Sequence, residues 1–147
     1  DVPLPEIQRR NRHGRYLWGD YLGLRFDPPP DLRLFNLETA VTETIDNDDV
    51  PKSKGINYHL HSANLPELMR AYDEERHGGS ERIPYVISFA NNHALDFGKT
   101  AFVNETIPLL RGGFNMIGAG IDWDDAARPF QTEIRGTPIQ IFAAATA

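Results

Sequence analysis

The side chains best suited to chemistry stand in residues 91–96, which read Asn-Asn-His-Ala-Leu-Asp. The amide oxygen of Asn92 can complete a metal shell without adding charge. The imidazole of His93 can stabilise or protonate a leaving oxygen, and Asp96 is close enough in sequence to orient that ring. Glu38 follows another apolar run and offers a carboxylate that can bridge two metal ions. These residue types together predict a metal-dependent hydrolytic site.

Each of these residues also has a purely structural interpretation. An Asn before a helix is a common cap, and a single His near a strand end is more often a hydrogen-bonded structural residue. Local sequence alone favours that interpretation. Suitable groups at two strand ends, Asn36-Leu37-Glu38 and Asn91-Asn92-His93, strengthen the catalytic one.

Two apolar runs must position these groups. Residues 32–37 are expected to form a core strand, and residues 85–89 are the most convincing buried strand. In open α/β sheets, ligands bind beyond the carboxyl ends of the strands. We therefore expect Glu38 and the stretch 91–96 to lie at one edge of a sheet.

The rest of the chain alternates strands with helices, which indicates α/β architecture. Further strands are expected at 56–60 and 114–117, and as a hairpin of 130–134 with 139–142 across 135–138. Helices are expected at 16–26, at 64–76 with Ser62 as the N-cap, at 100–111 with Pro108 kinking it or shifting its start, and at 122–127. Residues 39–54 are expected to form a polar, solvated loop.

Composition narrows the class of protein. The 147 residues suit one domain, and the net charge of -6 with no extended basic cluster argues against a nucleic-acid binder. There is no Cys, and no apolar run is long enough to span a bilayer. The chain opens on Asp1 and closes on a strand pattern followed by small residues. We expect it to be a piece of a longer protein, with residues 1–15 a flexible arm.

Four residues outside the main stretch are weaker candidates. His59 and His61 are two apart, so in a strand they would share a face and could chelate a metal. More often such a pair is partly exposed and inert. Lys52 and Lys54 could meet an anionic substrate at the rim, although a solvated loop is the simpler expectation.

Several other motifs are better explained by structure than by function. Gly118-Ala119-Gly120 precedes a short helix and could receive a phosphate, but it lacks the fuller nucleotide fingerprints and is expected to be a tight turn. Acids in the first turn of that helix are favoured by the helix dipole; they are Asp122, Asp124 and Asp125. Trp18 and Trp123 are expected to be packing residues.

Five blocks in chain order carry a family resemblance. They are Asn36-Leu37-Glu38-Thr39-Ala40-Val41-Thr42, Lys54-Gly55-Ile56-Asn57-Tyr58, Ala90-Asn91-Asn92-His93-Ala94-Leu95-Asp96-Phe97-Gly98, Gly118-Ala119-Gly120 and Ala126-Ala127-Arg128-Pro129. This set closely resembles the CapA family of poly-gamma-glutamate capsule synthesis proteins. That family looks like a branch of the calcineurin-like metallophosphoesterase superfamily. The resemblance covers the chain from about Tyr16 to its end.

The resemblance implies a metallophosphatase-like sandwich of two sheets flanked by helices, of which residues 16–147 would be an incomplete domain. It implies two divalent metal ions of the Mn, Fe or Zn type. Glu38 would match the acidic metal ligand and Asn92 the ligand Asn. His93 would match the acid or charge stabiliser, and Asp96 would support it without touching the metal.

Two departures from the family pattern affect the expected metal site. Family members usually begin with a strand ending in Gly-Asp, which supplies the first ligand. Here Gly19-Asp20 follows Tyr16-Leu17-Trp18, which resembles a helical stretch downstream of that strand, so Asp20 is a weak candidate. The family's later His ligands would come after Ala147. The chain is therefore expected to carry the middle of the site.

Three functions follow as hypotheses. The leading one is a metal-dependent hydrolase acting on an anionic small molecule or polymer. The second is a non-catalytic accessory factor that binds or exports an anionic polymer such as poly-gamma-glutamate. The third is a purely structural domain. The resemblance also suggests work at the cell envelope, although a shared fold does not fix function.

Overall fold

The structure is a computed structural model that describes Trp18, Tyr21, Leu24 and residues 26–43, 49–74 and 83–146. The predicted arm 1–15 and the candidate Asp20 lie outside the described residues. The chain divides into two units. One comprises Asp1–Pro30 and Asn64–Arg82, and the other comprises Asp31–Ala63 and Ile83–Ala147. All of the candidate chemistry lies in the second unit.

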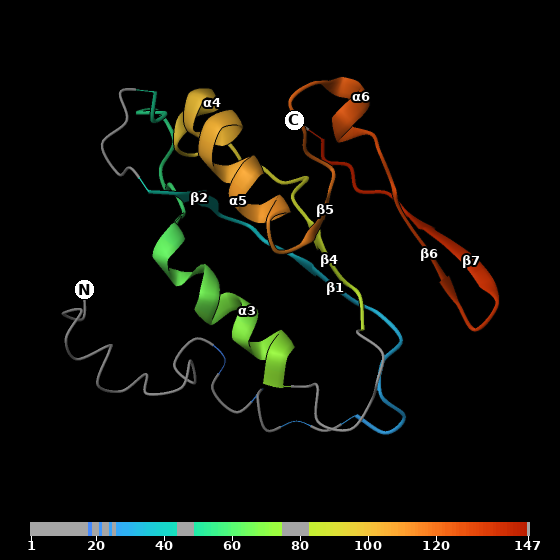
Figure 1. The fold of residues 1–147 in the computed structure, drawn as a ribbon. Helices are drawn as coiled ribbons and strands as arrows, with labels where there is room; N and C mark the ends of the chain where they lie inside the picture. The colour runs from blue at the N-terminus through green and yellow to red at the C-terminus, as the bar shows by residue number, and fades with distance from the viewer. Residues whose placement is uncertain are drawn as a thin grey trace. The chain divides into compact units, whose positions relative to one another are not determined.

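A parallel sheet of three strands forms the centre of the second unit (Figure 1). Its strands are β1 (Arg33–Asn36), β4 (Tyr85–Ser88) and β5 (Asn115–Ile117), in the order β1-β4-β5. The predicted strands at 32–37, 85–89 and 114–117 are thus confirmed. The middle strand is the most buried, with Val86 and Ile87 fully shielded from solvent, as its apolar run predicts. Parallel strands with intervening helices are consistent with an α/β fold.

The register of this sheet brings the ends of its strands together. Asn36 lies opposite Ser88, and Ser88 lies opposite Ile117. The pairing continues one residue further, because Leu37 N donates to Ser88 O at 3.1 Å and Phe89 N donates to Ile117 O at 2.9 Å. The segments that follow β1 and β4 therefore leave the sheet side by side.

Strand β1 is less buried than predicted. Leu34 is 51% exposed, and half-buried and exposed positions alternate along the strand. Successive side chains of a strand point to opposite faces of the sheet, so Arg33 and Phe35 share the more buried face. Phe35 on the packed face meets Phe114 edge-on, with ring centroids 6.4 Å apart.

Two further parallel strands, β2 (Ala40–Thr42) and β3 (His59–His61), pair with each other. The prediction of a polar loop was wrong for β2, whose three residues are all buried. A run this short shows no periodicity, and its burial depends on a distant helix, where the Thr106 hydroxyl donates to Val41 O at 2.8 Å. Strand β3 begins three residues later than the predicted strand 56–60.

One irregular helix covers residues 98–111, close to the predicted 100–111. It consists of α4 (Gly98–Ala101), the π-helical segment η3 (Phe102–Thr106) and α5 (Ile107–Arg111). Ile107 N donates to Phe102 O, the wider spacing that defines a π turn. Pro108 follows at once. Because the Pro108 nitrogen carries no hydrogen, an unbroken α-helix would lose one backbone hydrogen bond at this position. The prediction that Pro108 kinks the helix or shifts its start is confirmed, since α5 begins at Ile107 after the π-helical segment.

The last elements are a short helix and a hairpin. They are α6 (Trp123–Ala126), β6 (Phe130–Ile134) and β7 (Thr137–Ile141). Asp122, expected to be a first-turn acid, is the N-cap of α6, since its Oδ1 accepts a hydrogen bond from Asp125 N at 2.8 Å. Arg135 and Gly136 form the turn with φ of 51° and 77°. Two such residues suit a type I′ turn, so β7 starts two residues earlier than predicted.

The first unit contains the helix α3 (Leu65–Glu74), which follows the 3-10 turn η2 (Ser62–Asn64). The predicted helix over 64–76 is confirmed as far as residue 74. The indole of Trp18 donates to Glu67 O at 3.0 Å, in keeping with a packing role. Among the helices of the described residues, none is long and apolar enough to cross a membrane.

Candidate functional site

Asn91 joins the two strand ends that the sequence singled out. Its side-chain amide donates to Asn36 Oδ1 at 3.1 Å and to Leu37 O at 3.0 Å, so the loop after β4 is tied to the end of β1. Its carbonyl oxygen accepts from His93 N at 3.0 Å. Asn36 in turn donates to Glu38 Oε2 at 2.9 Å. Asn91 is therefore a scaffold residue that fixes where Glu38 and His93 lie.

His93 and Asp96 form a buried pair. His93 Nδ1 lies 2.6 Å from Asp96 Oδ2, and the two residues are 8% and 1% exposed. Burial alone would raise the pKa of Asp96, but hydrogen bonds from Lys54, His93 and Tyr58 outweigh it and hold that pKa below its usual range. An ionised carboxylate only accepts, so Nδ1 is the nitrogen that carries the proton. The other nitrogen, Nε2, lies 3.8 Å from Glu38 Oε1.

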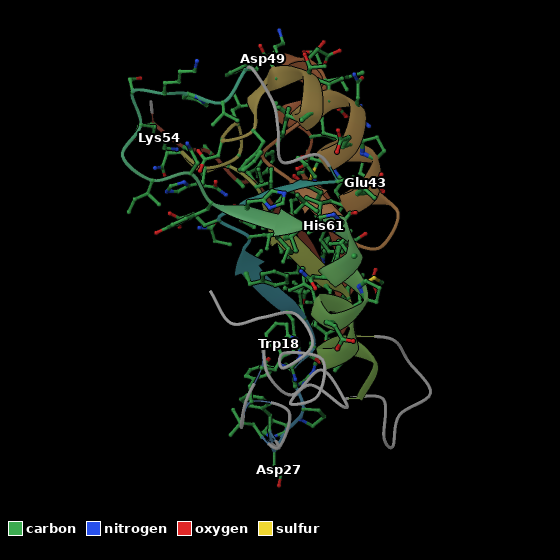
Figure 2. All side chains as sticks on the ribbon, turned by 90° about the vertical axis from the view of Figure 1, so that its left-hand side faces the viewer. Trp18, Asp27, Glu43, Asp49, Lys54 and His61 are labelled. Carbon is green, nitrogen blue, oxygen red and sulfur yellow. The ribbon has the colours of Figure 1, made fainter. Side chains whose placement is uncertain are left out.

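The segment that leads into β3 completes the surroundings of this pair. The ammonium of Lys54 is ion-paired with Asp96 and donates to Asn92 O at 2.5 Å. Tyr58 N donates to Asp96 Oδ2 at 2.5 Å, and the Tyr58 ring stacks on His93 with centroids 4.0 Å apart. Figure 2 shows Lys54 at one end of the β2–β3 pair, opposite the end that carries His61.

The sequence prediction missed the part played by Lys54 and Tyr58. Lys54 was expected on a solvated loop, whereas its side chain is only 26% exposed and reaches Asp96. The usable signal was the block 54–58, which belongs to the family resemblance but had no assigned role. The structure supplies that role as a contact with the loop after β4.

The structure thus brings together three of the four predicted site residues, Glu38, His93 and Asp96. Asn92 meets the cluster through its backbone carbonyl, while the residue itself is exposed. Glu38 has a side chain that is 46% exposed. Hard oxygen donors of this kind suit a divalent cation. Within the described parts of the chain, no group of three or more His, Cys, Asp or Glu side chains is placed to hold a metal ion.

The pair His59 and His61 fits the structural interpretation better than chelation. His59 Nε2 lies 2.9 Å from Thr42 Oγ1, and its ring packs 4.5 Å from that of Phe97. Burial lowers the pKa of His59, although the Thr42 contact partly opposes that shift. His61 Nδ1 accepts from Ala63 N at 3.1 Å. The two rings stand nearly perpendicular, with centroids 6.3 Å apart.

The turn at residues 118–120 is closely packed. Gly118 has φ of +78°, and a Cβ there would lie 2.7 Å from the Cβ of Ala90. Asp125 is more than a first-turn acid, because it accepts from Ile121 N at 3.0 Å and from Arg111 at 2.8 Å. Those two bonds, led by the one from Ile121, hold the pKa of Asp125 below its usual range. Residues 118–125 therefore form a closely packed, hydrogen-bonded segment directly after β5.

Comparison with known proteins agrees with the resemblance seen in the sequence. The family model described as bacterial capsule synthesis protein PGA_cap matches residues 4–147. Two relatives in Mycobacterium tuberculosis, from strains CDC 1551 / Oshkosh and ATCC 25618 / H37Rv, are each named a probable polyglutamine synthesis accessory protein. Each is 31% identical over 121 residues, which is 82% of this chain but 27% of the relative. The chain therefore spans about a quarter of the length of these curated relatives, and it belongs to the bacterial capsule synthesis protein family.

Proposed function

We propose that the chain is the central part of a metal-dependent hydrolase domain in a protein of capsule synthesis. In the intact protein it would contribute to a metallophosphatase-like sandwich that works on an anionic substrate at the cell envelope. One observation carries the proposal. The His93–Asp96 pair, joined at 2.6 Å, stands at the carboxyl edge of the sheet with Nε2 facing Glu38 at 3.8 Å.

The residues divide the work of such a site. Glu38 and Asn92 would hold divalent ions of the Mn, Fe or Zn type, together with ligands from outside the described residues. Such ions supply a nucleophile at neutral pH and neutralise developing negative charge. In its protonated form, His93 Nε2 can give a proton to the leaving oxygen of an ester or to the leaving nitrogen of an amide. The carboxylate of Asp96, at Nδ1, compensates the positive charge on that ring.

The decisive experiment uses the full-length protein with phosphate esters and poly-gamma-glutamate as substrates. Chelation should abolish turnover, and a divalent metal added back should restore it. His93→Ala should lower kcat by about 10²- to 10⁴-fold, the usual contribution of a positioned acid. His61→Asn is the matched control and should stay within about twofold of wild type. Full activity that survives both chelation and His93→Ala would refute a metal-dependent hydrolase.

A second candidate function is a non-catalytic accessory factor that binds an anionic polymer. The names of the two mycobacterial relatives favour it, since both are called accessory proteins. The net charge of -6 argues against direct binding of a polyanion unless bound cations supply positive charge. Binding of poly-gamma-glutamate that persists in chelator, without turnover of any substrate, would support this candidate. A full-length protein that takes up no metal at all would instead indicate a structural domain.

A further inference from the structure

Lys54 occupies an unusual place for a loop lysine. It lies 42 residues before Asp96, yet its ammonium meets three groups of the loop after β4. These groups are the Asp96 carboxylate, the Asn92 carbonyl at 2.5 Å and His93 Nδ1 at 3.3 Å. A lysine exposed on a solvated loop would leave its ammonium in water. Here the ammonium is directed into the turn that carries the proposed site.

We infer that Lys54 is a positioning residue that fixes the His93 ring and the Asn92 backbone in their functional arrangement. The inference rests on the proposed function and identifies a further residue of the same site. An ammonium has donors and no acceptor, so Lys54 cannot accept a hydrogen bond from the Nδ1–H of His93. It acts instead on the partners of the ring, by binding Asp96 and Asn92.

The hydrogen bonds divide the Asp96 carboxylate between its two oxygens. Lys54 takes Oδ1, while His93 Nδ1 and Tyr58 N take Oδ2. With both oxygens bound, the carboxylate cannot rotate, so the imidazole keeps Nδ1 toward Asp96. That leaves Nε2 on the side of Glu38, where a substrate would lie.

Tyr58 shows that the Lys54 contact belongs to a larger arrangement. Its ring lies nearly parallel to that of His93, at an interplanar angle of 18°, and covers one face of the imidazole. Its backbone bond to Asp96 comes from the same segment, only four residues after Lys54. The segment 54–58 therefore holds the His93 ring in two ways: Lys54 and Tyr58 N bind its partner Asp96, and the Tyr58 ring stacks on the imidazole.

Direct capture of an anionic substrate is the competing role for Lys54. Its positive charge is already offset by Asp96, and three quarters of its side chain is covered. A cation used for substrate capture would be open to solvent and free of a carboxylate, as expected for a phosphate-binding Lys. The geometry therefore favours positioning. The two roles also differ kinetically. Removing a lysine that captures substrate would raise KM, whereas removing a positioning lysine would lower kcat.

The test uses full-length protein labelled with 15N-histidine, with His93→Gln to assign the His93 signals. In wild type the Nδ1 proton should give a resolved signal that exchanges slowly with water. Lys54→Met should broaden or lose this signal, and it should lower kcat by about 10- to 100-fold with KM within about twofold. Lys54→Arg, which keeps the charge and the donors, should recover part of both. Lys52→Met is the matched control, because Lys52 is an exposed lysine of the same loop, and it should change neither.

The inference is overturned if folded Lys54→Met keeps the wild-type His93 signal, if its kcat is unchanged in an active protein, or if Lys52→Met has the same effect. If Lys54→Met does not fold, Lys54→Gln is measured in its place and judged by the same criteria. If wild type turns over no substrate, the proposed function fails, and the His93 signals alone decide the role of Lys54.

Discussion

The substitution Asp96→Asn tests how the site is held together, because this carboxylate is nearly inaccessible to solvent and accepts bonds from three donors. The Asn carbonyl can replace Oδ2 and keep the bonds from His93 and Tyr58. Its amide then stands where Oδ1 was, so that two donors face each other at Lys54. The substitution therefore removes one charge-assisted bond and leaves an ammonium without its counter-charge.

The expected loss in the free energy of unfolding is about 2–4 kcal/mol. Breaking a buried ion pair costs about 3–5 kcal/mol, and losing a hydrogen bond to a charged group costs about 1.5–3 kcal/mol. The lower part of this range applies because the Lys54 side chain is 26% exposed and can recover some hydration. Urea unfolding of the full-length protein should show a lower midpoint with an unchanged slope. Asp124→Asn, an exposed first-turn acid, is the control and should lose less than about 1 kcal/mol.

Wild type and Asp96→Asn also differ in how their stability should depend on pH. Burial would raise the pKa of Asp96, but its three donors hold it below the ordinary value of about 3.9. Its contribution to stability is therefore complete above that value and is lost as the pH falls through the lower, folded-state pKa. The difference between wild type and Asp96→Asn should be constant from about pH 7 to pH 5 and shrink below about pH 4. A difference no larger than that of Asp124→Asn at pH 7 would refute the reasoning.

Two further predictions concern packing and titration elsewhere in the second unit. Gly120→Ala should lower the free energy of unfolding by about 1–3 kcal/mol, because the added Cβ would lie 2.5 Å from Ala126 N. Gly112→Ala is the control and should be nearly neutral, because its Cβ would meet only contacts of 3.4 Å. Urea unfolding compares the two variants. His59 has a pKa lowered by burial, so its contribution is present above about pH 6.5 and is lost as the pH falls through the folded-state pKa. The stability advantage of wild type over His59→Gln should therefore be smaller at pH 5 than at pH 7, and equal advantages would contradict the assignment.

The main sheet could be predicted from the sequence because its information is local. The strands over 33–36, 85–88 and 115–117 lie within short stretches rich in apolar residues that are followed by polar or glycine-containing turns. Strand β2 could not be predicted, since three residues show no periodicity and Val41 is buried by partners far along the chain.

The candidate site divides in the same way. The proximity of Glu38 to His93 follows from the geometry of parallel strands, whose carboxyl ends share an edge. The contact of His93 with Asp96 follows from a separation of three residues in a turn. The contribution of Lys54 depends on the path of a loop that looks solvated from its composition. The composition around Lys52 and Lys54 does not distinguish the half-buried Lys54 from the exposed Lys52, and only the family block 54–58 sets Lys54 apart.

The bonding of Asp96 also bears on whether this motif can be transplanted. A designer who grafted residues 90–98 onto a loop of another sheet would copy His93 and Asp96 but not their surroundings. The acceptor oxygens of Asp96 would lack the two donors that come from residues 54 and 58. The smallest portable unit is therefore a discontinuous one, made of the loop after β4, the segment 54–58 and the end of β1 that Asn91 anchors.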